Sequence, residues 1–272
     1  AEFHHCGEMK RAEYPVPKDD EHPQLSAVPR KRSQQSSRLL SALTAAAQVT
    51  DGHNHRYALR NVCLQGDHGR IVATDGRQLT AHNGFTFPWK GDVLVPANKV
   101  FGCKPWQDVD GIEVGTSKTH FFVMAGPWRL WLPTDKEGRF PRVDDVIPRL
   151  DQVTTTITIA DEDAAFVLEQ SKQLPADDKS CPSVTIEAGG KIVLRAAEDR
   201  RSVPVELELT NSHRTGQKLL CNTDRRYLLH ALAQGYRQLQ LTGAELPILC
   251  REEERLYLWA ALASGDAIPP GK

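Results

Sequence analysis

Long apolar runs are missing from this sequence of 272 residues. No run approaches the ~18 residues that a membrane-spanning helix needs, and the first residues lack the basic-then-apolar layout of a secretory signal peptide. The composition, 40% apolar and 25% charged, is typical of a folded globular protein. We therefore expect a cytoplasmic protein that is long enough for two domains, each with its own core.

Paired cysteines are missing as well. The six cysteines form no C-x-x-C pair, which argues against a zinc knuckle and against a disulfide framework. Cys63, Cys221 and Cys250 stand inside apolar strand patterns, so we expect them to be small core residues.

Neither sign of charge is in clear excess, since the formal net charge is −1. Most nucleic-acid-binding domains carry a surplus of Lys and Arg. A near-neutral total can still hide a basic stripe on one face of the molecule. The distribution of the charges in space therefore decides whether nucleic acid is a partner.

Catalytic signatures are also absent: the sequence has no G-x-S-x-G, P-loop or H-E-x-x-H motif. His53-Asn-His55, near Asp51 and Asp75, could form a hydrolytic or metal cluster, but no third ligand stands at a recognisable spacing. His4-His5-Cys6 likewise has no partner cluster. We predict a protein that is not an enzyme and has no metal site or cofactor.

What is present is mainly strand pattern. Between His55 and Phe87, apolar and polar residues alternate, and Gly66 to Gly69 and Asp75-Gly76 supply turns, which predicts consecutive antiparallel strands. Before them, residues 29–49 are rich in helix formers, so we predict a helix there. Its first half would carry Arg30, Lys31, Arg32 and Arg38.

The second half of the chain repeats this plan of strand, helix, strands, helix and strands. The period of about 115 residues predicts two copies of one α+β module. We expect a leader or a remnant of a missing first domain at residues 1–28, modules at 29–150 and 151–263, and a tail at 264–272.

Three motifs resemble the bacterial sliding clamp, the β subunit of DNA polymerase III. Val72-Ala-Thr-Asp-Gly-Arg-Gln-Leu79 is similar to the A-T-D-G-x-x-L segment of the clamp's middle domain. Gly138-Arg-Phe-Pro141 with Val146-Ile-Pro148 resembles the end of that domain, and Leu219 to Leu228 resembles a helix start in the last domain. The resemblance covers about residues 30 to 262, and Glu13-Tyr14-Pro15 looks like the tail of the family's first domain.

The resemblance implies a non-catalytic processivity factor that encircles duplex DNA, with antiparallel sheets outside and helices on the inner face. A positive lining without base-reading groups attracts phosphates and permits sliding. Arg56 and Tyr57 match family positions implicated in DNA contact. From charge and expected face we add the other DNA-binding candidates, which are Arg30, Lys31, Arg32, Arg38, Arg225 and Arg226.

The resemblance also implies a hydrophobic pocket between the two modules, in which DNA polymerase, the clamp loader and other partners dock a short peptide. The matching residues are Leu59, Thr74, Gly76, Arg77, Gln78, Leu79, Pro141, Val146, Tyr257, Leu258 and Ala260. Arg77-Gln78, Asp145 and Ala260-Ala261 depart from the family pattern. We therefore expect either an altered peptide specificity or a tail that lies across the pocket.

The sequence alone leaves the number of chains in the assembly undecided. Six modules complete the family's ring, so chains with two modules would form a homo-oligomeric trimer. If a first domain is missing, the ring would be a dimer. The alternative function is a clamp-derived protein-binding module, or a fragment, that does not encircle DNA.

Overall fold

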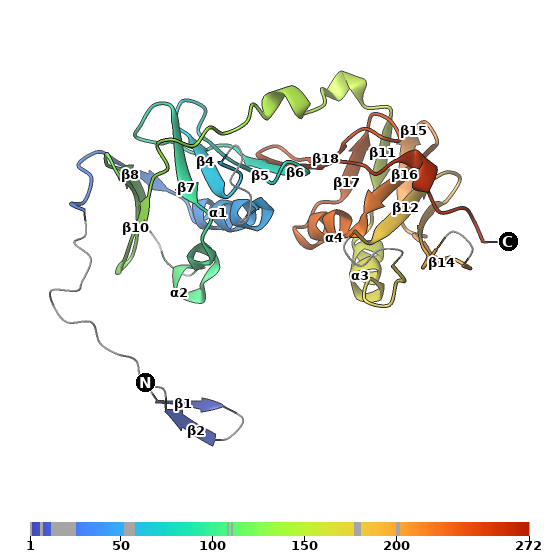
Figure 1. The fold of residues 1–272 in the computed structure, drawn as a ribbon, viewed down its shortest axis with the longest axis horizontal. Helices are drawn as coiled ribbons and strands as arrows, with labels where there is room; N and C mark the ends of the chain where they lie inside the picture. Colours follow the sequence, from blue (N-terminus) through green and yellow to red (C-terminus); the bar gives the residue numbers. More distant parts are fainter. Residues whose placement is uncertain are drawn as a thin grey trace.

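The computed structural model describes residues 2–5, 8–11, 26–51, 58–107, 109, 111–176, 181–199 and 202–271. Its two halves have antiparallel sheets on one side and helices on the other (Figure 1). At the start of the chain, β1 (Glu2–His5) and β2 (Glu8–Arg11) pair as a separate hairpin. No helix in the described ranges is both long and apolar enough to cross a membrane.

The first half consists of two consecutive strand-helix-strand units. The first unit has β3 (Arg32–Gln35), α1 (Arg38–Val49), β4 (Asn61–Gln65), β5 (Arg70–Thr74) and β6 (Gln78–His82). The second has β7 (Asp92–Pro96), the 3-10 turn η3 (Lys99–Gly102), α2 (Lys104–Gln107), β8 (Ile112–Thr116), β9 (His120–Ala125) and β10 (Trp128–Pro133).

The second half repeats these two units. The first has β11 (Thr155–Thr158), α3 (Asp161–Gln170), β12 (Ser183–Ala188), β13 (Ile192–Ala196), β14 (Val205–Glu208) and the extra strand β15 (His213–Gly216). The second has β16 (Leu219–Asp224), α4 (Arg225–Ala233), β17 (Gln238–Leu241), β18 (Ile248–Arg251) and β19 (Arg255–Trp259). The predicted α+β repeat is confirmed.

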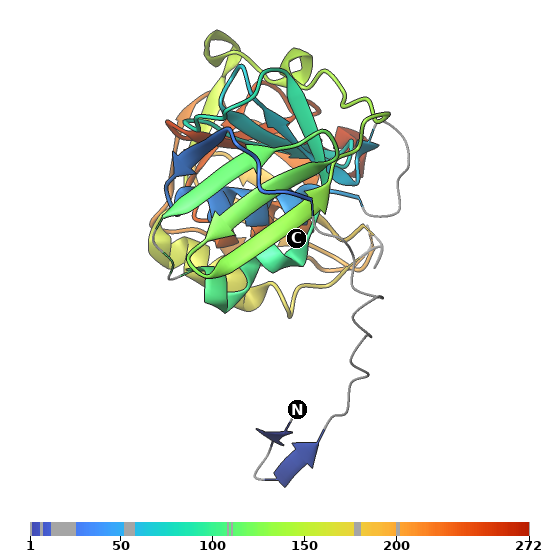
Figure 2. The same cartoon turned by 90° about the vertical axis from the view of Figure 1, so that its left-hand side faces the viewer.

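A nine-stranded sheet joins the halves, in the order β15-β11-β17-β18-β19-β6-β5-β4-β7. A four-stranded sheet closes each end, with the orders β10-β9-β8-β3 and β14-β13-β12-β16. Figure 2 looks onto the first of these end sheets. Because β6 pairs directly with β19, the two halves share one hydrogen-bonded framework.

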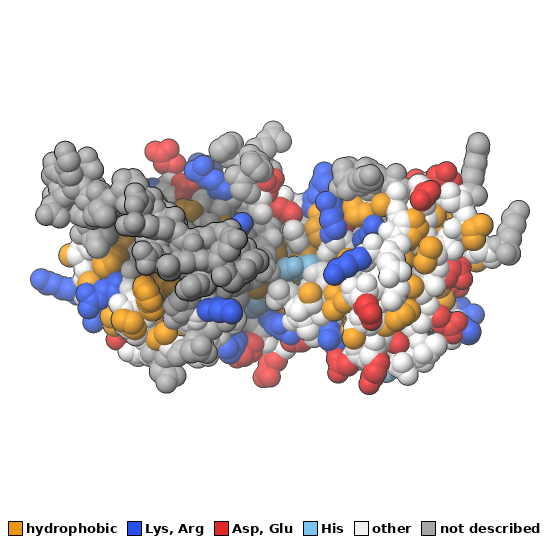
Figure 3. All heavy atoms as spheres, turned by 90° about the horizontal axis from the view of Figure 1, so that it is seen from below, with side chains coloured by type: hydrophobic (Ala, Val, Ile, Leu, Met, Phe, Trp, Pro, Cys, Tyr) orange, Lys and Arg blue, Asp and Glu red, His pale blue; other side chains and the backbone are white. Residues whose placement is uncertain are grey.

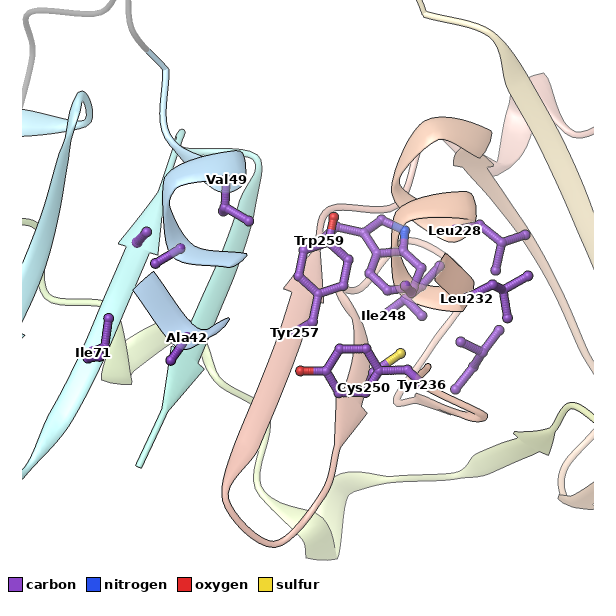
Figure 4. Packing of buried hydrophobic residues seen from close by; sticks show 14 of the residues in the cluster. Ala42, Val49, Ile71, Leu228, Leu232, Tyr236, Ile248, Cys250, Tyr257 and Trp259 are labelled. Carbon is purple, nitrogen blue, oxygen red and sulfur yellow. The ribbon is translucent and has the colours of Figure 1, made fainter. Parts of the chain in front are cut away.

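The main core lies between the sheets and the helices. Leu39, Leu43 and Ala46 of α1 are fully buried, as their helical spacing predicts. In the second half, Trp259 packs with Leu228 and Leu232 of α4 (Figure 4). Cys63, Cys221 and Cys250 are buried and free, which confirms their predicted place in the core.

A second, smaller core covers the opposite face of the nine-stranded sheet. The segment between the halves, residues 134–150 with the turn η4 (Asp144–Val146), runs over this face, and its last residue begins η5 (Leu150–Gln152). Phe140, Val143 and Ile147 of this segment pack on the sheet. We call residues 134–150 the strap.

The predicted helix over residues 29–49 is wrong in its first part. The helix begins at Arg38, and residues 32–35 form β3, whose Ser33 faces Val114 of β8. Arg, Lys and Gln are good helix formers, but the exposed edge of β8 offers a ladder of backbone hydrogen bonds, and this tertiary pairing outweighs local propensity.

Candidate DNA-facing and peptide-binding surfaces

The helical side is the candidate DNA-facing surface. In the first half it presents Arg38 at the start of α1, together with Lys99 of η3 and Lys104 of α2, all exposed. The residues of α1, η3 and α2 include no Asp or Glu. The three helical elements of this half are therefore cationic.

Of the four cationic residues that we expected on the first helix, Arg30, Lys31, Arg32 and Arg38, only Arg38 lies on this side. Its guanidinium forms an ion pair with Glu254, donates from Nη2 to the Asn83 carbonyl (3.2 Å), and lies 5.7 Å from the centre of the Phe85 ring. Glu254 belongs to the β18–β19 turn of the second half. Arg38 thus also links the two halves.

The prediction that Arg30, Lys31 and Arg32 lie on the first helix is wrong. Arg30 and Lys31 precede β3, and Arg32 is in it, at the edge of an end sheet. Arg32 Nε donates to Glu113 Oε2 (2.6 Å) across the β3–β8 pair. Arg56 and Tyr57, and also His53 and His55, lie outside the described residues.

The two predicted arginines of α4 have structural partners. Arg225 Nη1 donates to the carbonyls of Leu174 (2.9 Å) and Pro175 (2.7 Å), which holds the chain after α3. Arg226 forms a two-pronged ion pair with Asp224, the N-cap of its own helix, and this contact raises the Arg226 pKa. The Arg226 side chain is still half-exposed.

Helix α3 gives the helical side an acidic stretch that the sequence prediction missed. Its first turn is Asp161-Glu162-Asp163, and Glu169 follows two turns later. Asp163 is buried and accepts from Asn211 and Ser212, whereas Glu162 and Glu169 are exposed on either side of the exposed Phe166. Figure 3 shows basic, acidic and apolar side chains intermingled on this side of the second half.

The seam between the halves is the candidate peptide-binding region. Leu79 of β6 faces Leu258 of β19, and both side chains lie on the strap side of the sheet. The Thr74 to Gln78 turn is closed by Gly76 N–H donating to Thr74 Oγ1 (3.0 Å). Gly76 has φ +91°, which suits glycine, and Leu59 lies beside it.

The strap brings further predicted residues to this side. Pro141 is half-buried and Val146 is 54% exposed. Two arginines fix the strap to the sheet. Arg70 Nη1 contacts Asp144 Oδ1 at 2.7 Å, and this contact lowers the Asp144 pKa. Arg251 Nη2 donates to the Pro148 carbonyl at 3.0 Å. Leu79 and Leu258 are almost fully buried, so little of their apolar surface is open to a partner on this side.

Tyr257 does not lie with this group, because neighbouring residues of a strand point to opposite faces. It is buried on the helical side, where it contacts Tyr236 and Trp259 (Figure 4). Its hydroxyl donates to Gln78 Oε1 (2.5 Å), so Gln78 also faces that side. Ala260 is exposed, and its N–H donates to the Arg77 carbonyl (2.8 Å). Tyr257 is therefore corrected to a core residue.

The chain's last residues do not cross the seam groove. They run over the end sheet β14-β13-β12-β16, where Ile268 is buried. The structure therefore offers no support for a tail that blocks the groove between Leu79 and the strap.

A cavity of about 400 Å³ opens at the seam on the helical side, which sequence reasoning did not anticipate. Its lining includes Arg38, Ala45, Phe85, His82 and Gln234, and also the acidic run Glu252 to Glu254. Burial, with the charges of Arg255 and Arg38, lowers the pKa of His82 to about 4. Gln234 Nε2 donates to Gln48 Oε1 (3.1 Å), so the helical layers touch here.

Comparison with known proteins gives a result at the level of the fold. No protein-family model and no curated protein sequence matches the chain. Among solved structures, the chain is similar to the DNA polymerase III subunit beta of Pseudomonas aeruginosa, with 18% identity and a TM-score of 0.76 over 90% of this chain and 70% of that one.

Two further solved structures agree. The beta subunit of Streptococcus pyogenes DNA polymerase is 16% identical, with a TM-score of 0.74 over 91% of this chain and 70% of that one. The DNA polymerase III subunit beta of Borrelia burgdorferi is 11% identical, with a TM-score of 0.77 over 90% and 66%. The resemblance predicted from the sequence motifs is confirmed: this chain has the fold of the bacterial DNA polymerase III β sliding clamp.

Proposed function

We propose that the protein is a sliding-clamp processivity factor that encircles duplex DNA without reading its sequence. In this role it is a non-catalytic accessory subunit of a cytoplasmic DNA polymerase. The observation that carries the proposal is the arrangement of the helices on one side of two repeated modules, with Arg38, Lys99 and Lys104 exposed on that side. Point charges without base-edge contacts hold phosphates but leave the duplex free to slide.

The internal repeat supports ring formation. Within the chain, β6 ends the first unit of one half and pairs antiparallel with β19, which ends the second unit of the other half. By the same unit order, β14 is equivalent to β6 and β10 to β19. Both β14 and β10 are at sheet edges, so neither has a partner strand on its outer side among the described residues of this chain. We infer that copies join head to tail through β14 and β10.

The two edges carry exposed side chains of opposite charge, although Glu206 and Glu208 also pair with Arg195 and Lys191 within the chain. β10 carries the half-exposed Trp128 and the exposed Arg129, and β14 carries the exposed Glu206 and Glu208. An exposed edge strand is a template for pairing with another chain. Three chains with two modules each would close a ring of six, which is the trimer predicted from the sequence.

The same proposal includes partner docking in the seam groove. Leu79 and Leu258 lie on the strap side of the sheet, Leu59 lies beside Gly76, and Val146 of the strap is exposed. A shallow apolar groove with a polar rim suits a short segment with a few apolar anchors, such as one from a polymerase or a clamp loader.

DNA encirclement can be tested without a loading factor. Rings are allowed to thread over the ends of a linear duplex, and both ends are then blocked with biotin-bound streptavidin. A closed ring stays on the blocked duplex at a salt concentration that abolishes non-specific binding, and it is released when a nuclease cuts the duplex. Equal loss before and after blocking would refute encirclement.

The second candidate function is a protein-binding module that does not encircle DNA. The acidic stretch of α3 favours it, because Glu162 and Glu169 around Phe166 suit a cationic partner segment better than phosphates. Peptide binding in the seam groove without retention on the blocked duplex would identify this function.

A further inference from the structure

The end sheet β14-β13-β12-β16 has a polar face turned away from the helices. One row of paired residues crosses all four strands of this face: Asn222 of β16, Thr185 of β12, Arg195 of β13 and Glu206 of β14. The neighbouring residues Cys221 and Ile186 belong to the core on the other face. Despite their polarity, Asn222 and Thr185 are fully buried and Arg195 is 4% exposed.

The last described residues of the chain cross this row and donate hydrogen bonds to residues of three of its four strands. Leu262 N–H donates to the Asn222 carbonyl (2.8 Å), Ile268 N–H donates to Thr185 Oγ1 (2.8 Å), and Gly271 N–H donates to Glu206 Oε1 (3.1 Å). Ile268 is buried against the sheet. From here on, the tail means residues 262–271, because the contacts with this face begin at Leu262.

The tail fits this face incompletely. A cavity of about 440 Å³ remains beside it, and its lining includes Leu262 and Ile268 of the tail, Asn222 of the sheet, and the acidic residues Glu198, Asp199 and Asp266. Thr185 Oγ1 donates to Asn222 Oδ1 (3.2 Å), so the amide end Nδ2 must find an acceptor elsewhere. Among the described residues, the buried Asn222 Nδ2 has no hydrogen-bond partner.

The unmet groups indicate what is missing. The tail donates N–H groups to acceptors of the row. Two donors of the row, Asn222 Nδ2 and Arg195 Nη1, have no acceptor among the described residues. Buried donors require acceptors. An extended peptide supplies backbone carbonyls at regular intervals, together with side chains that can fill the cavity beside Ile268.

We propose that this face is a peptide-binding groove for a segment of a partner protein, and that the tail is its autoinhibitory occupant. The partner is not a second copy of this chain, because another copy of the same tail would leave Asn222 Nδ2 unmet in the same way. The partner segment has an apolar anchor in the place of Ile268 and a carbonyl directed at Asn222. This site is separate from the seam groove and does not depend on DNA binding.

The first experiment uses the chain cut after Ala261 and a synthetic peptide of residues 262–271. The cut leaves β19 and the hydrogen bond from Ala260 to Arg77 in place. We expect saturable binding by fluorescence polarisation. We expect binding to the full chain to be at least tenfold weaker, because the attached tail competes at an effective concentration on the order of millimolar.

Two matched changes locate the binding. The peptide with Ile268→Asp should not bind, and Thr185→Val in the cut protein should weaken binding severalfold, because valine keeps the size of threonine but loses the acceptor for Ile268 N–H. If circular dichroism shows that the cut chain does not fold, full-length Ile268→Asp replaces it. Absence of saturable binding by the folded protein overturns the groove.

The second experiment tests the partner. A phage-displayed library of ten-residue peptides is selected on the cut protein. We expect recovered sequences with an apolar residue at the Ile268 position that displace the tail peptide. If no selected peptide displaces the tail peptide, this face binds only the tail and the proposal is wrong. Concentration-dependent dimers of the full chain that Ile268→Asp abolishes would identify a second copy as the occupant, which would also overturn it.

Discussion

At the scale of single residues, close contacts explain why a sequence motif has glycine at a particular position. Gly138 begins the Gly-Arg-Phe-Pro segment, and its N–H donates to Asp135 Oδ1 (2.8 Å). A Cβ atom there would lie 2.6 Å from Asp135 Oδ2 and 2.9 Å from the Ala58 Cβ. Asp135 also accepts from Asn61 (2.8 Å), and these hydrogen bonds lower its pKa. The glycine thus lets the strap start against the sheet.

Gly138→Ala should therefore lower the free energy of unfolding by about 1–3 kcal/mol, the usual cost of overpacking. The matched control is Gly190→Ala, since a Cβ at Gly190 meets nothing within 4 Å. Urea denaturation of both variants measures the difference. Equal unfolding free energies of the two variants would show that the turn at Asp135 accommodates the added Cβ atom without loss of stability.

His82 should make stability depend on pH. Its folded-state pKa, about 4, lies below the unfolded value of about 6.5. The unfolded chain therefore takes up a proton first as the pH falls, and stability is lost from about pH 6.5 down to about pH 4. The loss is about 2 kcal/mol, reduced from the full shift because the ring is partly exposed.

His82→Gln should flatten the curve of unfolding free energy between pH 6.5 and 5, above the range in which carboxylates titrate. His213→Gln, a change at an exposed histidine, is the control. Denaturation at several pH values measures both. An unchanged slope in His82→Gln would assign the loss to other groups.

At the scale of secondary-structure elements, the helical layers of the two halves differ in charge. The elements η3 and α2 contribute Lys99 and Lys104, whereas α3 contributes Glu162 and Glu169, all exposed. If duplex DNA passes along this side, attraction comes mainly from the first half. The second half limits the total affinity, which favours sliding over tight binding.

Lys99→Ala with Lys104→Ala should weaken binding to duplex DNA and lower the slope of log affinity against log salt by about 0.9 for each phosphate that the protein no longer neutralises. Glu162→Gln with Glu169→Gln should strengthen binding. Titrations at several salt concentrations measure both pairs. The same slope in all variants would place the DNA elsewhere on the molecule.

At the scale of the whole molecule, the proposed contact between copies repeats the pairing at the seam between β6 and β19. Its equivalents, β10 and β14, lie in the two end sheets. Head-to-tail contacts of this kind close into a ring only when the rotation from one chain to the next is a whole fraction of a full turn. The fold therefore determines whether a ring or an open chain forms.

Trp128→Asp on β10 should convert the oligomer to single chains, because it places a carboxylate against the acidic β14. Leu150→Asp is the matched control, since Leu150 is 59% exposed but lies outside both end sheets. Light scattering after size exclusion measures the mass, and we expect three times the mass of one chain for the unchanged protein and for the control. A monomeric unchanged protein would refute the ring.

The sequence by itself determined the repeated α+β plan, the buried cysteines and the strands on either side of the seam. Alternation of apolar and polar residues is a local property, and it encodes which residues of a strand are buried. The A-T-D-G turn and the Gly-Arg-Phe-Pro segment were equally visible, because each requires glycine at a fixed position.

Only the tertiary structure decided the rest. Residues 32–35 form a strand because β8 offers an edge, Tyr257 belongs to the core because the register of β6 and β19 sets its face, and Arg226 is held by Asp224. The path of the tail over Thr185 and Glu206 follows from pairings between residues far apart in the chain. Such contacts depend on where distant elements meet, which no local pattern records.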